Sequence, residues 1–303
     1  MKILALLNRD GGTLKTTDHE ELTALMRDEF SIHGHELAVE SRAGDEIVAA
    51  IKAAARRDDL DVLLVGGGDG TVSAAAAALA HGGIALGILP AGTMNLFART
   101  LQIPLDLPAA VAALAGGVVV NVDISSVNDR IFVHQFAVGL HARMVRMRSK
   151  IQYGSRLGKI VATARAVFLA LRRVPAIELE LEIDGVLKRI KSPAVAVSNN
   201  LYGVGHIPYA DDPRGGELGV YICTERKVGA VTKLTFDILT GAWRQNPDLL
   251  SQTAQRVHIH YRGKNRKKRA VLDGELCTLD AESIVEIHPR ALKVLVPAEA
   301  TYL

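Results

Sequence analysis

The sequence predicts two domains, an α/β domain built on a parallel sheet and a second, mainly β domain that resembles a sandwich. Two observations lead to this fold class. Strand-like and helix-like runs alternate through the first third of the 303 residues, and strand-like runs dominate after about Val122. A chain of this length suits two domains of ordinary size. We expect an α/β domain at 1–124 and a β-rich domain at 125–303, with the extreme C-terminus able to return to the first domain.

In the α/β domain, short apolar runs predict buried strands and amphipathic runs predict helices. The predicted strands are residues 3–7, 36–39, 62–65 and 84–89. The predicted helices are residues 20–30, 45–57, 72–80, 96–100 and 108–114. Strands that alternate with helices indicate βαβ units, and therefore a parallel sheet covered by helices on both faces.

The second domain is predicted mainly from short runs in which apolar and polar residues alternate. These runs are residues 131–138, 177–183, 188–197, 218–223, 256–261, 269–272 and 283–287. Asp184 and Gly185 stand between two of them and are typical of a tight hairpin turn. Residues 158–174 are the exception, because their apolar residues recur at helical spacing.

The composition indicates a globular intracellular protein. Apolar residues make up 49% of the chain and charged residues 23%. The two cysteines, Cys223 and Cys277, lie far apart and form no disulfide framework or zinc motif. The apolar run at 3–7 is too short for a signal peptide, and no tract is long enough to span a membrane. We therefore expect a reducing, cytoplasmic location.

Charge is unevenly distributed along the chain. Residues 1–125 hold 9 basic and 16 acidic residues, whereas residues 126–303 hold 27 and 17. Nine Lys and Arg and no acidic residue fall in 141–173, and six more basic residues fall in 262–269. A basic second half is consistent with an anionic partner. The alternative is that the two halves are merely different domains. The low aromatic content of 4% and the lack of a nucleic-acid motif argue against nucleic acid.

The strongest local motif is a run of glycines between a predicted strand and a predicted helix. It consists of Gly66, Gly67, Gly68, Asp69, Gly70 and Thr71. Glycines allow close approach of a ligand and positive φ, and a helix start offers unpaired N–H groups to phosphate. Asp69 repels phosphate, so its presence points to Mg²⁺ binding or to the orientation of a hydroxyl. A tight turn without a ligand is the alternative.

A second loop repeats this design after the strand at 84–89. It reads PAGTMN at 90–95, and Thr93 and Asn95 are suited to capping a helix or contacting phosphate. Ligands of open parallel sheets lie at the carboxyl ends of strands, where both loops fall. Two other nucleotide motifs are absent, since no Walker A sequence occurs and no GxGxxG follows the first strand.

Together these loops resemble the diacylglycerol kinase catalytic-domain family, which includes sphingosine kinases and bacterial lipid kinases. NAD kinases belong to the wider superfamily. GGGDGT followed by PAGTMNLFAR carries the resemblance, with Val122-Asp123-Ile124, SNN at 198–200 and Leu272-Asp273-Gly274-Glu275 behind it. The family implies ATP in a cleft between an α/β domain and a β-rich domain, with Mg²⁺ and a lipid alcohol as the other reactants.

The resemblance also implies roles for particular residues. Asn8, the residues from Gly66 to Thr71, and Thr93 match nucleotide contacts. Asp273 and Glu275 match a motif that supplies the general base, and we favour Glu275. Two close carboxylates raise each other's pKa or share a metal, which suits proton abstraction. On its own, this motif is more typical of a solvated hairpin turn.

Three departures from the family pattern qualify these roles. Ser73 and Ala74 stand where the family often has Asn-Glu, and Glu40 stands where relatives often have Thr. Gly215 and Gly219 replace acidic residues of an accessory metal site, which leaves Asp212 and Glu217 as its weak remnants.

Two pairs of histidines are each separated by one residue, His33/His35 and His258/His260, and such pairs could bind metal. No third ligand follows either pair at a spacing typical of a metal site, so we expect these histidines to be surface residues.

We therefore expect an ATP-dependent lipid kinase that acts on a diacylglycerol-like or related lipid at the inner membrane face. The basic loop 262–269 is the better candidate for contact with an anionic leaflet, because we assign the apolar stripe of 158–174 to the core. A kinase of a soluble hydroxyl such as NAD and a non-catalytic nucleotide-binding regulator remain alternatives. The oligomeric state is left open, with a homodimer as one option.

Overall fold

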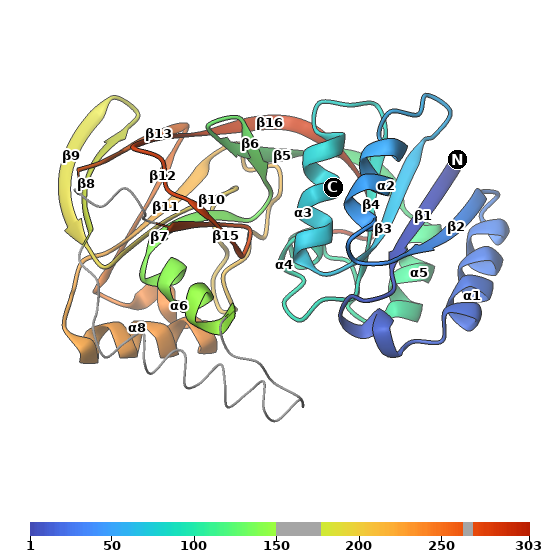
Figure 1. Cartoon of the computed structure of the whole chain (residues 1–303), viewed down its shortest axis with the longest axis horizontal. Helices are drawn as coiled ribbons and strands as arrows, with labels where there is room; N and C mark the ends of the chain where they lie inside the picture. The colour runs from blue at the N-terminus through green and yellow to red at the C-terminus, as the bar shows by residue number, and fades with distance from the viewer. Residues whose placement is uncertain (150–176, 263–268) are drawn as a thin grey trace.

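The computed structural model describes residues 1–149, 177–262 and 269–303. Two lobes are visible in Figure 1, one rich in helices and the other rich in strands. The predicted fold class, an α/β domain with parallel strands followed by a sandwich-like domain, is confirmed. The predicted helix at 158–174 and most of the basic loop 262–269 lie outside the described residues.

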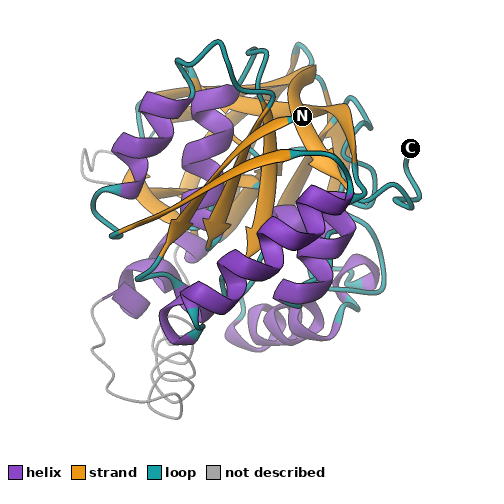
Figure 2. Cartoon of the chain, turned by 90° about the vertical axis from the view of Figure 1, so that its right-hand side faces the viewer, coloured by secondary structure: helices purple, strands orange, loops and turns teal. Residues whose placement is uncertain are grey.

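The first lobe contains the parallel strands and most of the helices. Its strands are β1 (Lys2–Asn8), β2 (Glu36–Arg42), β3 (Val62–Gly67) and β4 (Ala85–Pro90). Its helices are η1 (Gly12–Thr16), α1 (His19–Ile32), α2 (Ile47–Ala54), α3 (Asp69–Leu79), α4 (Leu96–Thr100) and α5 (Leu107–Ala115). The strands pair in the order β2-β1-β3-β4, all parallel, and Figure 2 shows helices on both faces of this sheet.

The second lobe stacks an antiparallel extension of this sheet on a separate six-stranded sheet. The extension contains β5 (Val118–Val127), β6 (Arg130–Phe132), β8 (Ile177–Ile183), β9 (Val186–Ser192), β13 (Arg256–Tyr261) and β16 (Glu282–Val296). The second sheet contains β7 (Gln135–Gly139), β10 (Ala194–Ser198), β11 (Leu218–Cys223), β12 (Leu249–Ala254), β14 (Arg269–Leu272) and β15 (Glu275–Thr278). The inward side chains of both sheets form one apolar core.

Two helices cover the outer face of the second sheet. They are α6 (Leu140–Ser149) and α8 (Val228–Thr240), and the short η2 (Trp243–Gln245) follows α8. Leu140 of α6 and Val231 and Leu234 of α8 are buried in a small core with Cys223. No helix in the described parts of the chain is long and apolar enough to cross a bilayer.

Strand β16 joins the two lobes (Figure 1). Its first half pairs with β13, and near its end Val294 pairs in parallel with Leu86 of β4. A register shift between His288 and Leu292 interrupts its long pairing with β5. The buried residues Leu292 and Val296 belong to the core of the first lobe. The C-terminal segment therefore completes the α/β sheet.

Two strands predicted as continuous are broken in the structure, so those predictions were wrong. The run 131–138 divides into β6 and β7, which belong to different sheets. The run 188–197 divides into β9 and β10 at Pro193, which has no N–H to donate to a ladder. The turn between β8 and β9 is confirmed, and Asp184 and Gly185 both have positive φ, as a type I′ hairpin turn requires.

Candidate active site

The glycine run forms the connection between β3 and α3. The glycines allow close packing at this connection. The prediction that they adopt positive φ was wrong, because none of them does. A Cβ at Gly66 would lie 2.6 Å from Cδ2 of Leu7, and one at Gly67 would lie 2.7 Å from Oγ1 of Thr71. Helix α3 begins at Asp69 and not at the predicted Val72, so Asp69, Gly70 and Thr71 form its first turn.

No side chain caps the N-terminus of α3. Its N-cap residue is Gly68, and the first intrahelical bond runs from the N–H of Val72 to the carbonyl of Gly68. The amides of the first turn therefore have no partner within the helix. In contrast, Asp18 caps α1 and Asp106 caps α5 with side-chain oxygens. Amides without a partner in the helix and the positive end of the helix dipole suit a phosphate group.

Asp69 links the glycine run to the second loop. Its Oδ2 accepts the N–H of Asn95 at 3.1 Å, and its Oδ1 accepts the N–H of Leu96 at 2.7 Å. The carboxylate thus caps the start of α4, not the helix to which Asp69 belongs. Each oxygen already accepts one hydrogen bond, so a role of Asp69 in Mg²⁺ binding or catalysis stays a prediction.

Asn95 holds its own loop closed. It adopts the left-handed conformation at φ 50°, is buried, and exchanges two side-chain hydrogen bonds with the backbone of Gly92. A Cβ at Gly92 would lie 2.7 Å from Cα of Gly68, so the two loops touch backbone to backbone. Asn95 therefore supports its own loop, and its contact with a nucleotide stays a prediction. Thr93 is exposed at the edge of the loop.

Asn8 reaches the same region from the end of β1. Its Nδ2 donates to Oγ1 of Thr71 at 3.4 Å, and its Oδ1 accepts the N–H of Asp10. Thr71 is itself buried. The carboxyl ends of β1, β3 and β4 thus bring together the residues that the sequence predicted at a nucleotide site. Whether they bind a nucleotide stays a prediction.

The motif at 273–275 forms the turn between β14 and β15, and its two carboxylates have different environments. Asp273 is buried and lies in the left-handed conformation at φ 46°. Its Oδ1 accepts the N–H groups of His134 and Gln135, and its Oδ2 accepts the N–H of Val133 and the hydroxyl of Ser73. Burial raises the pKa of Asp273 above its usual value, and these four bonds oppose that rise.

These bonds explain why the predicted strand at 131–138 is broken. The amides of Val133, His134 and Gln135 all donate to one carboxylate, and Val133 and His134 lie between β6 and β7, outside both strands. The oxygens of Asp273 are fully occupied by donors from its own domain and from α3. This geometry suits a residue that positions the turn, and it leaves little capacity to accept a proton from a substrate.

Glu275 has the opposite environment. It is exposed, and it accepts no hydrogen bond within the described residues. A Cβ at Gly70 would lie 2.8 Å from Oε1 of Glu275 and meets no other atom nearer than 3.8 Å. The free carboxylate of the second domain therefore lies against the uncapped first turn of α3. The structure separates the two carboxylates that the sequence left undecided.

Ser73 was singled out as a departure from the family pattern, and the structure gives it a contact. It lies one turn into α3, and its hydroxyl donates to Oδ2 of Asp273 at 2.8 Å. This bond crosses from the first domain to the second. Sequence reasoning missed it because Ser73 and Asp273 stand 200 positions apart.

Asp212 and Glu217, the expected remnants of an accessory metal site, do not form a ligand cluster within the described residues. Oδ1 of Asp212 accepts the N–H of Arg214, which closes a local turn, and Glu217 is exposed. Within the described residues, neither belongs to a group of three or more ligand side chains; the one such group is elsewhere, on β8 and β13. An accessory metal at Asp212 and Glu217 stays a prediction.

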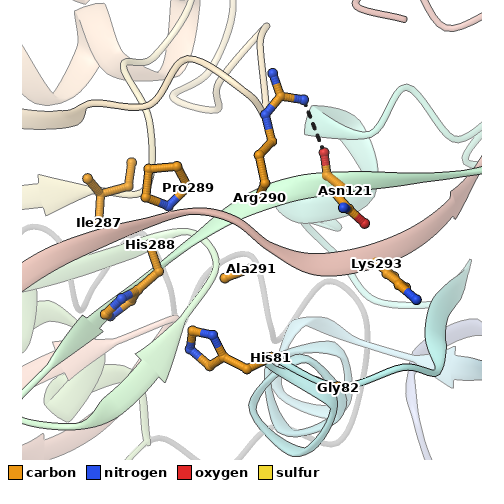
Figure 3. A pocket seen from close by; sticks show the side chains of 9 residues that line it. All are labelled: His81, Gly82, Asn121, Ile287, His288, Pro289, Arg290, Ala291 and Lys293. Atoms are coloured by element: carbon orange, nitrogen blue, oxygen red, sulfur yellow. Dashed lines mark hydrogen bonds between the residues drawn. The ribbon is translucent and has the colours of Figure 1, made fainter.

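One pocket lies apart from this chemistry. A cavity of about 510 Å³ opens at the junction of the domains, near the end of α3 that is remote from Gly70. Figure 3 shows His81 and His288 side by side, while Arg290 and Lys293 point to different sides of β16. Arg290 is also engaged by the carbonyl of Asn121. The cationic side chains do not converge, so the pocket does not form a site for an anion.

Comparisons with known proteins match both domains. Residues 2–127 match the family model for the diacylglycerol kinase catalytic domain, and residues 136–296 match the one for the YegS C-terminal NAD kinase beta sandwich-like domain. The chain belongs to the diacylglycerol kinase catalytic-domain family. This confirms the resemblance drawn from the two loops and places the chain in a kinase family.

Individual relatives of this kinase family agree with the assignment. A diacylglycerol kinase of Bacillus subtilis is 26% identical over 265 residues, which cover 85% of this chain and 84% of that protein. An uncharacterized protein of Synechocystis is 29% identical over 84% of this chain, which spans 60% of that protein's length. The crystal structure of a diacylglycerol kinase from Bacillus anthracis is similar in fold, with a TM-score of 0.73, 19% identity, and coverage of 99% of this chain and 98% of that one.

Proposed function

We propose that this chain transfers the γ-phosphate of ATP to the hydroxyl of a diacylglycerol-like or related lipid, and that Glu275 is the general base. One observation carries the proposal. The only unengaged carboxylate of the turn at 273–275 lies against the uncapped start of α3, where a Cβ on Gly70 would be 2.8 Å from it. A proton acceptor and a phosphate-binding helix terminus are thus adjacent.

The residues at this junction fit ATP. The close approach of Gly68 and Gly92 leaves no room for side chains, and the first turn of α3 offers free amides. We assign the phosphates to Gly66, Gly67, Gly68 and Thr71, and further nucleotide contacts to Asn8 and Thr93. Backbone donors of this kind bind phosphate oxygens without adding bulk.

The donor set also fits Mg²⁺ that arrives with the nucleotide. Mg²⁺ prefers carboxylate, phosphate and water oxygens, and it usually takes only one or two carboxylates from the protein. Asp69, in the first turn of α3, has one acceptor position used on each oxygen and would hold the ion, while Glu275, which faces this turn, stays free to accept a proton. When bound, the ion neutralises charge on the phosphates.

The chain's own residues then supply positioning and one proton acceptor. Glu275 takes the proton of the lipid hydroxyl as the hydroxyl oxygen attacks the γ-phosphorus of ATP; the bond from that phosphorus to the bridging oxygen breaks, and ADP leaves. A positioned base contributes roughly 10²–10⁴-fold in rate. Asp273 is a positioning residue, because its four hydrogen bonds fix the turn that presents Glu275. The hydrogen bond from Ser73 connects that turn to α3 and so fixes the position of the base relative to the phosphate site.

The lipid substrate rests on the family and on charge. Relatives are named as diacylglycerol kinases, and the second half of the chain is basic. We assign the loop 262–269 to contact with an anionic leaflet, which places the protein in the cytoplasm at the inner membrane face; each basic residue near such a surface contributes about 1 kcal/mol. The loop itself lies mostly outside the described residues.

The direct test is transfer of radiolabelled γ-phosphate from Mg·ATP to a panel of diacylglycerol, phosphatidylglycerol, sphingosine, ceramide and NAD. Label in the organic phase that depends on one lipid supports the proposal and names the acceptor. Label only in NADP would assign the chain to soluble substrates. ATP binding without transfer to any acceptor would favour a regulator that has lost catalysis.

A further inference from the structure

Two histidines and a glutamate lie together on the outer face of the second domain. His258 and His260 are two residues apart on β13, so their side chains are on the same face of the strand. Their ring centroids are 3.8 Å apart. Strand β8 pairs with β13 and sets Glu182 opposite His258. One ligand atom from each of these three residues lies within 4.8 Å of the other two.

One nitrogen of this cluster is shielded and has no hydrogen-bond partner. Nε2 of His258 is buried, and within the described residues no donor or acceptor satisfies it. Buried polar atoms are normally paired, and an unpaired one costs about 1–3 kcal/mol. The side chains of His258 and His260 are 21% and 30% exposed, so a small ion can reach them from solvent.

Glu182 differs from the other glutamates on the same face of β8. Glu178 pairs with Lys191 at 2.6 Å, and Glu180 pairs with Arg189 and Arg262. Glu182 has no basic partner in the described ranges, although it is half-buried, and it faces an imidazole. Its charge is therefore available to a cation that the histidines also bind.

A fourth candidate ligand comes from the strand on the other side of β13. Glu282 of β16 lies opposite His260, with Oε1 at 3.5 Å from Nδ1 of His260 and Oε2 at 3.7 Å from Nε2 of His258. The set of two imidazoles and two carboxylates comes from three neighbouring strands, β8, β13 and β16 (Figure 1).

We propose that Glu182, His258 and His260, with Glu282 as the fourth ligand, bind a zinc-type divalent cation. Imidazole suits Zn²⁺, Cu²⁺ and Ni²⁺, whereas Mg²⁺ requires oxygen ligands in a strict octahedron. Zinc bonds of about 2.0–2.2 Å in a tetrahedron place ligand atoms about 3.4 Å apart. The ligand atoms of Glu182, His258 and His260 lie within 4.8 Å of one another, so these side chains must rotate to close on an ion. The ion ties three strands of the second domain together and is separate from Mg²⁺ at the kinase site.

The test is Zn²⁺ titration of the full chain, free of any histidine tag, by calorimetry and by competition with a chromogenic chelator. We expect one Zn²⁺ per chain, binding at least tenfold weaker in His260→Ala and Glu182→Gln, and no displacement by excess Mg²⁺. His33→Ala is the matched control, because His33 is an exposed member of the other alternate pair. Zn²⁺ is also expected to raise the melting temperature of the parent and of the control by a few degrees, and that of the two site variants less.

Equal affinity in the parent, His260→Ala and Glu182→Gln would overturn the proposal. So would an equal loss in His33→Ala, which would indicate adventitious binding to surface histidines. Displacement by Mg²⁺ would overturn the assignment to a zinc-type ion. None of these outcomes depends on whether the chain is an active kinase.

Discussion

Gly70→Ala is expected to displace the proposed base, Glu275, without destabilising the fold. The added Cβ would lie 2.8 Å from Oε1 of Glu275, whereas ordinary contacts begin at 3.4 Å. The carboxylate must therefore move by at least about 0.6 Å. Glu275 is exposed and flexible, so the fold accommodates this shift, and alanine within a helix is favoured over glycine by roughly 0.5–1 kcal/mol.

The expected result is a slower enzyme with an unchanged or raised melting temperature. A displacement near 1 Å of a positioned group costs up to about 10²-fold in rate, so we expect kcat for lipid phosphorylation to fall by roughly 10- to 100-fold. The assay is steady-state transfer of labelled phosphate, combined with thermal unfolding and ATP binding. Gly83→Ala is the control, because its Cβ would meet nothing within 4 Å just beyond the other end of α3.

Parent-like kcat in Gly70→Ala, under conditions where Glu275→Gln is inactive, would refute the reasoning, since the base would then tolerate displacement. A large drop in the melting temperature would also contradict it. Loss of ATP affinity alone would show that Gly70 matters to phosphate binding and not to the position of Glu275.

Three further predictions concern the turn at 273–275 and its surroundings. Asp273→Asn puts an NH₂ donor in place of a carboxylate oxygen that accepts two hydrogen bonds. We expect chemical denaturation to show a free energy of unfolding lower by about 2–5 kcal/mol. A variant as stable as the parent would contradict the positioning role of Asp273. Ser73→Ala removes one hydrogen bond to that carboxylate and is expected to lower the free energy of unfolding by about 1–2 kcal/mol. Ser31 is exposed, so the control Ser31→Ala is expected to leave that free energy unchanged. Burial lowers the pKa of His134 to about 3, so protonation favours the unfolded chain, and stability is expected to fall as the pH drops below about 6.5. Between pH 7.5 and pH 5 the loss from His134 is about 2 kcal/mol. His134→Gln should make the profile shallower but not flat, because burial also lowers the pKa values of His35, His141 and His288. A parent profile no steeper than that of His134→Gln would disprove this.

Much of the fold could be predicted because local patterns determine it. The fully apolar runs at 62–65 and 84–89 became central parallel strands, since only such runs are buried on both faces of a sheet. The break at Pro193 could have been predicted from the missing N–H, although the run 188–197 was expected to be continuous. The break after Phe132 was not, because it depends on hydrogen bonds to Asp273, which is about 140 positions away. The length of β16 also depends on its pairing with β4 and β5.

The same division applies to the candidate site. Both phosphate-type loops were predicted because glycine, threonine and asparagine have conformational and capping properties that act locally. The sequence could not separate Asp273 from Glu275, since their difference lies in which distant amides each one meets. The third ligand beside His258 was missed for a similar reason. Glu182 reaches it only through the pairing of β8 with β13.

The most direct test of the central claim is phosphate transfer to the lipid acceptor by the parent and by Glu275→Gln, with the ATP dissociation constant measured for both. Gln keeps the size of Glu275 and removes its basicity. A base in this position predicts a loss of roughly 10²–10⁴-fold in kcat with ATP affinity unchanged. Equal kcat in the two proteins would contradict the assignment of Glu275 as the general base.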